Sequence, residues 1–252
     1  MDLHFLDPGL DYSIEGLLAF QQENQTEWWR EALFLFYPQV DRARFDAMHQ
    51  NERRAYLRET LAEVYANARP EIAAKTESYL AHWEKHRTQV EAAFSDAFRI
   101  DARAAMNDMR VRITLNPICP RYLQERAFDV FYRNSDAGAL GMSLHEMIHF
   151  AWFDVWQRAF CDDPAEYESP SLKWVFSEMA VEPLMRDRRL AEINPYFQDG
   201  CAYEYFYDMK IEGQKLFDQL ERLHRENDIL GFMKKGYAFC REHEPEIRAQ
   251  MR

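Results

Sequence analysis

The chain reads Ser143-Leu144-His145-Glu146-Met147-Ile148-His149-Phe150 at the start of a segment that has the apolar composition of a buried helix as far as Trp156. Residues four apart in sequence lie one turn apart on the same face of a helix. This HExxH pattern therefore predicts that His145 and His149 direct two imidazoles at one metal ion, with Glu146 beside the open coordination position. A zinc hydrolase requires that arrangement.

The same residues also have a purely structural interpretation. Ser143 and Glu146 fit a capping box at the start of a helix, and histidines on an apolar helix can be core residues. Against this, the three ionisable groups of the motif stand among apolar neighbours, where an unpaired polar group is costly. Those neighbours are Met147, Ile148, Phe150, Ala151 and Trp152. A metal ion would satisfy all three groups, and we therefore favour a metal site.

The third protein ligand is expected from a later helix. The pattern HExxHxxGxxH is excluded because Trp152 stands at the position of its Gly and Val155 at the position of its third His. Glu178 lies instead in an apolar helical stripe, which is an unfavourable place for a solvated carboxylate. Glu182 follows one turn later on the same face, where it can orient a zinc-binding histidine through the second ring nitrogen. The stripe contains Trp174, Val181 and Met185.

Two alternatives to Glu178 as a ligand remain at this point. Glu178 is an ordinary helix charge if it pairs with Lys173 or Arg186 instead. Asp162 and Asp163 are the other candidate ligands, as in zinc peptidases whose third ligand is an aspartate. The Gly-Thr signature that usually accompanies such an aspartate is absent from this sequence.

The set of His145-Glu146-x-x-His149, Glu178 and a second acid four residues later resembles the gluzincin metallopeptidases of the thermolysin type. The resemblance covers roughly residues 111–185, and the gap between His149 and Glu178 is longer than in thermolysin itself. It implies a zincin-like catalytic part, Zn²⁺ held by the two histidines and Glu178, and a peptide or protein substrate. It also implies Glu146 as general base and a Tyr or His that stabilises the oxyanion. Candidates for that last role are Tyr203, Tyr205, Tyr207 and His224.

Composition limits the function classes further. The 252 residues carry a formal charge of -12, which argues against nucleic acid and against an anionic membrane surface as partners. Apolar residues make up 47% of the chain, enough for a substantial core. The run from Ile148 to Val155 is too short for a membrane span and contains Asp154. No secretory signal is visible, so we expect a cytoplasmic protein.

The spacing of the cysteines also favours a cytoplasmic protein. The four cysteines are far apart and form no CxxC pair, which predicts free thiols in a reducing compartment. They are Cys119, Cys161, Cys201 and Cys240.

Hydrophobic periodicity predicts a mostly helical α+β protein. Helices are expected at 28–37 (opened by Asn24-Gln25-Thr26-Glu27), 51–70 and 70–99, with Pro70 as the first residue of the last one. Strands are expected at 111–115 and 127–132, the first of them either a core strand or an edge to which a peptide adds. After the motif, helices are predicted from Ser169-Pro170 to Pro183, from 208 to 226 and from 228 to 242, before a frayed tail.

Residues 1–110 would then be a helical scaffold or cap, and 111–252 a zincin-like metallopeptidase domain with a small sheet ahead of the motif helix.

Two other functions stay open from the sequence. One is a zinc-stabilised binding or scaffold protein, in which a closed four-ligand site holds the fold without turnover. The other is a helical protein that binds no metal.

Overall fold

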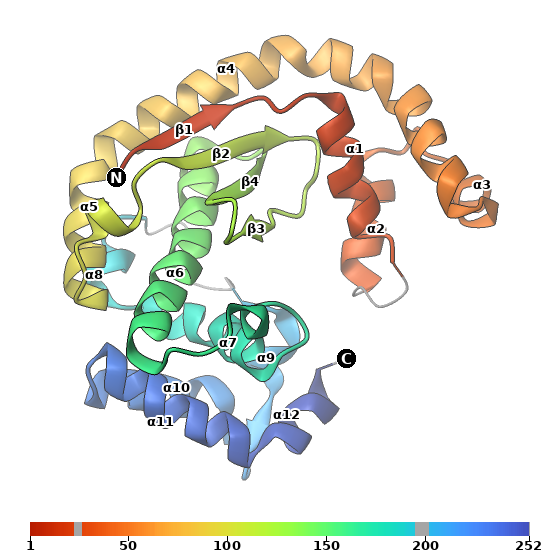
Figure 1. Cartoon of the computed structure of the whole chain (residues 1–252). Coiled ribbons are helices and arrows are strands. Elements are labelled where there is room, and N and C mark those ends of the chain that lie inside the picture. The colour runs from red at the N-terminus through yellow and green to blue at the C-terminus, as the bar shows by residue number, and fades with distance from the viewer. Residues whose placement is uncertain (23–26, 195–201, 252) are drawn as a thin grey trace. The chain divides into compact units, whose positions relative to one another are not determined.

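The computed structural model describes residues 1–22, 27–194 and 202–251, and it confirms a mostly helical α+β protein (Figure 1). Packing divides the chain into two compact units built from discontinuous segments. The sheet unit contains Leu3–Glu84 and Asp108–Ser143. The motif unit contains Met1–Asp2, Lys85–Asn107 and Leu144–Arg252. The functional division at residue 110 stays a prediction.

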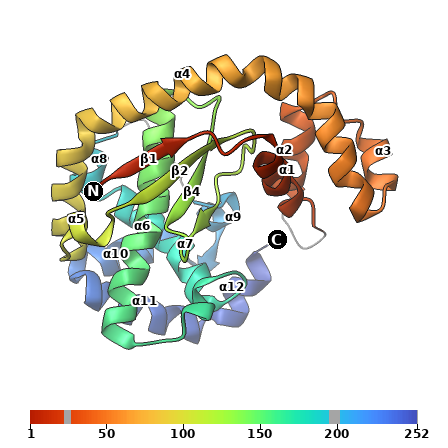
Figure 2. The ribbon, with the colours of Figure 1, turned by 45° about the horizontal axis from the view of Figure 1, so that its top comes forward.

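A four-stranded sheet forms the centre of the sheet unit. Its strands are β1 (Leu3–Leu6), β2 (Met109–Thr114), β3 (Arg121–Tyr122) and β4 (Ala127–Phe131), in the order β1-β2-β4-β3. Figure 2 shows β1, β2 and β4 side by side. Both pairings of β2 are parallel, and β3 pairs antiparallel with β4. One face of β2 and β4 buries completely a set of apolar residues, Val111, Ile113, Phe128 and Val130.

Strand β2 is a central strand, so the idea that it is an edge open to a substrate peptide is wrong. On one side Val111 is aligned with Phe128 of β4, and on the other side Met109 is aligned with Leu3 of β1. Strand β1 has only four residues, too few to show a period of two, and the sequence therefore gave no sign of a strand in the N-terminal helical region. The strands predicted at 111–115 and 127–132 are confirmed, with small shifts at their ends.

The helices before the motif are α1 (Leu10–Ala19), α2 (Glu27–Phe36), α3 (Arg42–Ala47) and α4 (Gln50–Phe98). Helix α4 runs unbroken through Pro70, so the prediction of two helices meeting there is wrong. A proline inside a helix removes one hydrogen bond to the carbonyl four residues earlier. Here that carbonyl belongs to Ala66, and both Ala66 and Pro70 are exposed, so water can serve the freed oxygen. The predicted helix start at 24–26 lies outside the described residues.

The turn that precedes the motif helix is fixed by α4. The Tyr79 hydroxyl donates to the carbonyl oxygens of Tyr132 at 3.1 Å and Asn134 at 2.7 Å. The Lys75 ammonium donates to the same Asn134 oxygen at 2.8 Å. These bonds join backbone acceptors close to the start of helix α6 (Asp136–Phe160) to side chains of α4.

Helix α6 begins seven residues before Ser143, so the capping-box interpretation of Ser143 and Glu146 is wrong. Ser143 is an interior residue, and its hydroxyl donates to the Ala139 carbonyl oxygen one turn earlier at 2.8 Å. The HExxH motif therefore lies in the middle of a long helix, where the backbone is regular and the one-turn separation of His145 and His149 is set by helix geometry.

The rest of the motif unit is helical apart from one short hairpin. Its elements are α5 (Ala102–Ala105), η1 (Pro164–Tyr167), α7 (Leu172–Met185), α8 (Arg188–Ala191), α9 (Glu204–Asp208), β5 (Lys210–Ile211), β6 (Gln214–Lys215), α10 (Leu216–Glu226), α11 (Ile229–Glu242) and α12 (Glu244–Gln250). Helices α7, α10 and α11 pack on one another. The core joins Trp152 of α6 to Phe176 of α7 and Phe232 of α11 through edge-to-face ring contacts.

Three details of the motif unit differ from the prediction. Helix α7 is capped by Ser171 and not by Ser169, since the Ser171 hydroxyl accepts from the Trp174 amide at 3.1 Å. The predicted helix start at 208 is replaced by the β5–β6 hairpin, whose turn places Gly213 at a positive φ of 77° that favours glycine. The expected frayed tail is helix α12.

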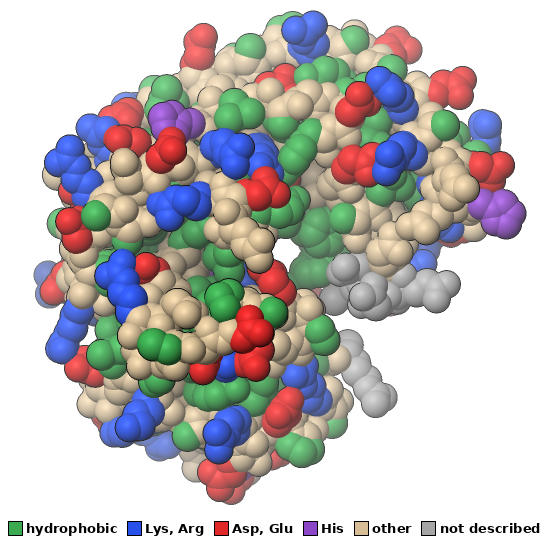
Figure 3. Space-filling model, in the orientation of Figure 1, with side chains coloured by type: hydrophobic (Ala, Val, Ile, Leu, Met, Phe, Trp, Pro, Cys, Tyr) green, Lys and Arg blue, Asp and Glu red, His purple; other side chains and the backbone are tan. Residues whose placement is uncertain are grey.

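Two further findings concern the whole described chain. Cys161 and Cys240 are free thiols, whereas Cys201 lies outside the described residues. Among residues 1–22, 27–194 and 202–251, no helix combines the length and apolar composition that crossing a membrane requires. On the face in view in Figure 3, basic side chains are interspersed with acidic ones.

Candidate metal centre

His145 and His149 meet at their Nε2 atoms, which lie 3.3 Å apart on one face of α6. Glu146 lies beside them, with Oε1 3.9 Å from His145 Nε2. One potential ligand atom from each of the three residues lies within 4.8 Å of the other two, so His145, Glu146 and His149 could hold a metal ion. We call these three residues the metal group. The structure therefore brings together the three residues that the HExxH pattern predicts.

Glu178 of α7 reaches the same group. Its Oε1 lies 3.5 Å from His149 Nε2, and its Oε2 lies 3.9 Å from His145 Nε2. In a tetrahedral zinc site with bonds of about 2.0–2.2 Å, neighbouring ligand atoms are separated by roughly 3.3–3.5 Å. The His145–His149 and His149–Glu178 separations have that length. The His145–Glu178 separation is longer, at 3.9 Å. Two imidazoles and one carboxylate are ligand types that Zn²⁺ binds, and two of their three separations match a tetrahedral site.

The side chains of His145, His149 and Glu178 are largely buried, and burying a carboxylate costs free energy unless a positive charge is nearby. The exposed fraction of the side chain is 0% for His149, 6% for Glu178 and 12% for His145. A carboxylate removed from water needs a positive partner to offset its lost hydration. A divalent ion held by this group would supply that charge. His145 is the most exposed of the three side chains.

Aromatic packing holds the two ligand-bearing helices together. The ring of Trp152, one turn after His149, contacts the ring of Phe176 at 5.1 Å, and Trp156 contacts the same ring at 6.3 Å. Phe176 is two residues before Glu178 on α7 and is completely buried. Gly236 of α11 lies so close to Phe176 that a Cβ atom there would be 2.4 Å from its Cζ. This packing fixes the rotation of α7 and hence the direction of Glu178.

The other candidate ligands, Asp162 and Asp163, and the candidate partner Lys173 form contacts that do not involve Glu178. Asp162 accepts a hydrogen bond from the Trp156 indole at 2.8 Å and pairs with Lys173 at 2.8 Å. That hydrogen bond to Lys173, more than any other contact, holds the pKa of the Asp162 carboxyl below its usual value. Asp163 caps η1 by accepting from the Ala165 amide. Lys173 therefore faces acids of the η1 segment and not Glu178.

Glu182 is buried one turn beyond Glu178. It accepts a hydrogen bond from the Tyr207 hydroxyl and forms an ion pair with Arg186 at 2.7 Å. Arg186 also pairs with Glu221 of α10 at 2.6 Å. These contacts tie α7 to α9 and α10. The role of Glu182 in orienting a histidine stays a prediction.

The four candidate oxyanion donors have different surroundings. His224 lies 3.8 Å from Asp187 and against the ring of Phe232, and burial lowers its pKa. It also lines a cavity with Arg189. Tyr207 is bonded to Glu182. Burial raises the pKa of the Tyr205 hydroxyl, and the negative charge of the Glu178 carboxylate raises it further.

Sequence reasoning missed one feature of this region. Trp174, which the sequence assigns to the apolar stripe of α7, is only half-buried and contacts the ring of Tyr203 at 6.0 Å. Helical periodicity placed it on the same face as Glu178 but gave no indication of its aromatic partner, which comes from a segment almost thirty residues later.

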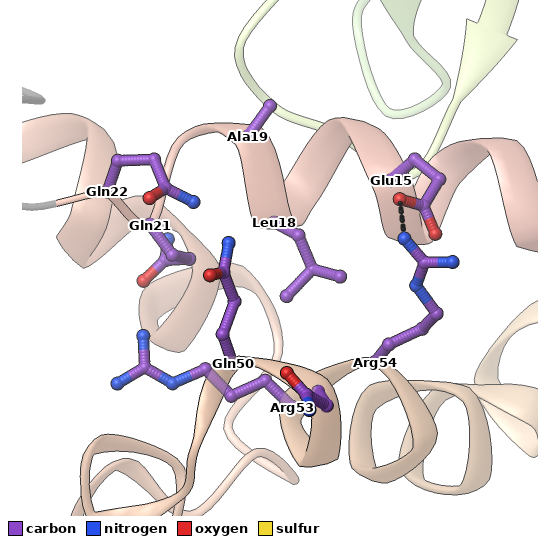
Figure 4. A pocket seen from close by; sticks show the side chains of 9 residues that line it. Glu15, Leu18, Ala19, Gln21, Gln22, Gln50, Arg53 and Arg54 are labelled. Carbon is purple, nitrogen blue, oxygen red and sulfur yellow. Dashed lines mark hydrogen bonds and ion pairs between the residues drawn. The ribbon is translucent and has the colours of Figure 1, made fainter.

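A separate cavity lies in the sheet unit, between α1 and the start of α4. Figure 4 shows Glu15, Leu18 and Gln50 around it, with Glu15 paired to Arg54 at 2.7 Å. Its lining combines side-chain amides, the Glu15–Arg54 ion pair, Arg53 and the apolar Leu18 and Ala19, and it contains no histidine or cysteine. It offers no catalytic group comparable to the HExxH cluster.

No protein-family model, curated protein or solved structure matches this chain.

Proposed function

We propose that this protein is a zinc-dependent metallopeptidase with a zincin-like catalytic part, in which His145, His149 and Glu178 hold Zn²⁺. The single observation that supports this most strongly is the approach of Glu178 to both imidazole Nε2 atoms. A carboxylate from a second helix turns a pair of histidines into a three-ligand set. Three protein ligands are the number found in catalytic zinc sites, whereas structural sites use four.

Each group then has a defined task. Bound zinc supplies Lewis acidity, which lowers the pKa of water and polarises a carbonyl. The Glu146 carboxylate accepts the proton of the attacking water and passes it to the leaving amine, so one group is first base and then acid. The Tyr205 hydroxyl donates a hydrogen bond to the carbonyl oxygen as negative charge develops on it. Burial of the site removes competing water and strengthens these electrostatic contacts.

The test replaces Glu146 by glutamine, which keeps the size of the side chain and removes its basicity. Zinc-loaded Glu146→Gln should retain one zinc per chain and lose peptide hydrolysis by roughly 10²–10⁴-fold. Hydrolysis is followed by mass spectrometry on a mixture of unstructured peptides. The matched control is Glu192→Gln, an exposed acid of the α8 region paired with Arg188, which should keep wild-type turnover.

Two results would reject the proposal. The first is a Glu146→Gln protein that hydrolyses peptides within about threefold of wild type. The second is a wild-type protein that binds zinc, unfolds on chelation and hydrolyses no peptide, which is the behaviour of a zinc-stabilised scaffold.

A further inference from the structure

Three aromatic side chains form a continuous row in the motif unit, which we call the aromatic row: Trp174, Tyr203 and Tyr205. Tyr203 and Tyr205 stack with ring centroids 5.3 Å apart and planes inclined by 16°. The Trp174 ring meets Tyr203 edge-on at 6.0 Å. Phe206, which is completely buried, supports both tyrosines from beneath at 5.9 and 4.6 Å. The row is therefore held rigidly by ring contacts.

The Trp174 end of the aromatic row belongs to the helix that carries Glu178. Trp174 lies one helical turn before Glu178 on α7, so the two side chains occupy the same face of the helix. At the other end, burial raises the pKa of the Tyr205 hydroxyl, and the negative charge of Glu178 raises it further. The row thus runs beside a proposed zinc ligand.

The aromatic row is not part of the closed core. The core rings of this unit, Trp152, Phe176, Phe206 and Phe232, are each exposed by 1% or less. All three rings of the row are only half-buried. Trp and Tyr present large apolar area with few rotatable bonds, so they lose little entropy when they bind a partner. Half-buried rings fixed by neighbours are suited to recognition.

We propose that the aromatic row binds a large apolar side chain, preferably an aromatic one, of a peptide positioned at the metal group. The row itself carries no charge, and rings pack best on other rings in stacked or edge-on contacts. The exposed Glu204, which stands between Tyr203 and Tyr205 in the chain, would repel an acidic side chain. The assignment rests on the proposed function for the reaction, but binding can be measured without turnover.

The experiment uses full-length, zinc-loaded Glu146→Gln protein and capped heptapeptides of Gly and Ala that carry Phe, Leu, Lys or Ala at the central position. Isothermal titration calorimetry should show the Phe peptide binding roughly tenfold more tightly than the Ala peptide. Adding Trp174→Leu should reduce this preference to less than about threefold. The control substitution Phe239→Leu removes a half-buried ring of α11 that contacts His243, and it should leave the preference intact.

The inference is overturned if the Phe peptide shows no measurable binding, if the Phe and Ala peptides bind equally, if the Lys peptide binds best, or if Trp174→Leu keeps the full preference. Zinc content and far-ultraviolet circular dichroism verify that each variant is folded, and Tyr203→Leu repeats the test if Trp174→Leu is not. Hydrolysis by the wild-type protein is assayed separately. If the wild-type protein cleaves peptides without aromatic preference, the inference is wrong and the proposed function stands. If the protein binds the Phe peptide selectively but cleaves no peptide, the inference stands and the proposed function is wrong.

Discussion

Glu178 Oε1 lies 3.5 Å from His149 Nε2, although the two residues belong to different helices and are separated by a polar loop. Both side chains are almost completely removed from solvent. A buried carboxylate beside two imidazoles is stable when a cation shares its charge. This pair therefore links the packing of α7 on α6 to the candidate metal site.

Removing the carboxylate charge should release the metal. Glu178→Gln keeps the volume of the side chain but offers only a neutral oxygen. Loss of an outer-shell partner typically costs 10–100-fold in metal affinity, and loss of a ligand should cost at least roughly 100-fold. Competition with a chromogenic zinc chelator measures the change. Glu192→Gln serves as control, and unchanged zinc affinity in Glu178→Gln would exclude Glu178 as a ligand.

Zinc should stabilise the folded protein. A ligand that binds only the native state at about 1,000 times its dissociation constant adds about 4 kcal/mol to the free energy of unfolding. Thermal unfolding followed by circular dichroism should therefore show a higher Tm with zinc than with a chelator. In His149→Ala the two melting temperatures should coincide. A zinc-dependent increase that persists in His149→Ala would place the binding elsewhere.

The hydroxyl of Tyr205 should matter for turnover and not for metal binding. Removing one donor to a developing oxyanion typically lowers kcat by about 10²–10³-fold. Tyr205→Phe should show that loss at full zinc content. Tyr237→Phe is the matched control, because Tyr237 is a half-buried tyrosine of α11 that packs on Trp156. A wild-type kcat in Tyr205→Phe would exclude Tyr205 as the oxyanion donor and leave Tyr203, Tyr207 and His224 as candidates.

Gly236 should resist substitution because helices α7 and α11 are in close contact there. An alanine Cβ would lie 2.4 Å from Phe176 Cζ and 2.8 Å from Cε2, both in a closed core. Overpacking of this kind costs about 1–3 kcal/mol. Urea unfolding should report that loss for Gly236→Ala. At Gly16 the nearest atom to a new Cβ is 3.4 Å away, so Gly16→Ala should be neutral or stabilising by up to about 1 kcal/mol.

A buried aspartate in the sheet unit should make stability depend on pH. Burial raises the pKa of Asp129 to about 7, opposed by a hydrogen bond from Tyr12 and by the charge of Arg112. The folded carboxyl thus keeps its proton up to about pH 7, whereas the unfolded one releases it near 3.8. The contribution that favours the fold is fully present below about pH 4 and is lost as the pH rises to 7.

Asp129→Asn should remove this pH dependence, because an amide stays neutral and can still accept from Tyr12. The variant should exceed wild type in stability at pH 8 by roughly 2–4 kcal/mol, and by clearly less at pH 5. Urea unfolding at both pH values measures the difference. Asp208→Asn, at an exposed position, should show no such change. Equal differences for Asp129→Asn at pH 5 and pH 8 would contradict the raised pKa.

Local patterns were sufficient to predict which side chains meet at the candidate metal site. His145 and His149 follow from helical spacing alone, and Glu178 stands out because an acid in an apolar stripe needs a partner. Both inferences depend on single helices, whose geometry is regular. The strands at 111–115 and 127–132 were readable for the same reason.

Features set by distant contacts were not predictable. Strand β1 exists because Leu3 pairs with Met109, a partner more than a hundred residues away. Helix α4 passes Pro70 because the lost hydrogen bond faces solvent, which the local sequence does not reveal. The aromatic row depends on Trp174 and Tyr203 meeting across a long segment. Such contacts arise from packing, and no local period encodes them.

The most direct test of the account is an anomalous difference map, calculated from data collected above and below the zinc absorption edge on crystals of zinc-loaded protein. The account predicts one strong peak about 2.0–2.2 Å from His145 Nε2, His149 Nε2 and a Glu178 carboxylate oxygen, with no fourth protein ligand. A peak bound by four protein ligands, a peak away from Glu178, or no peak at the HExxH helix would contradict it.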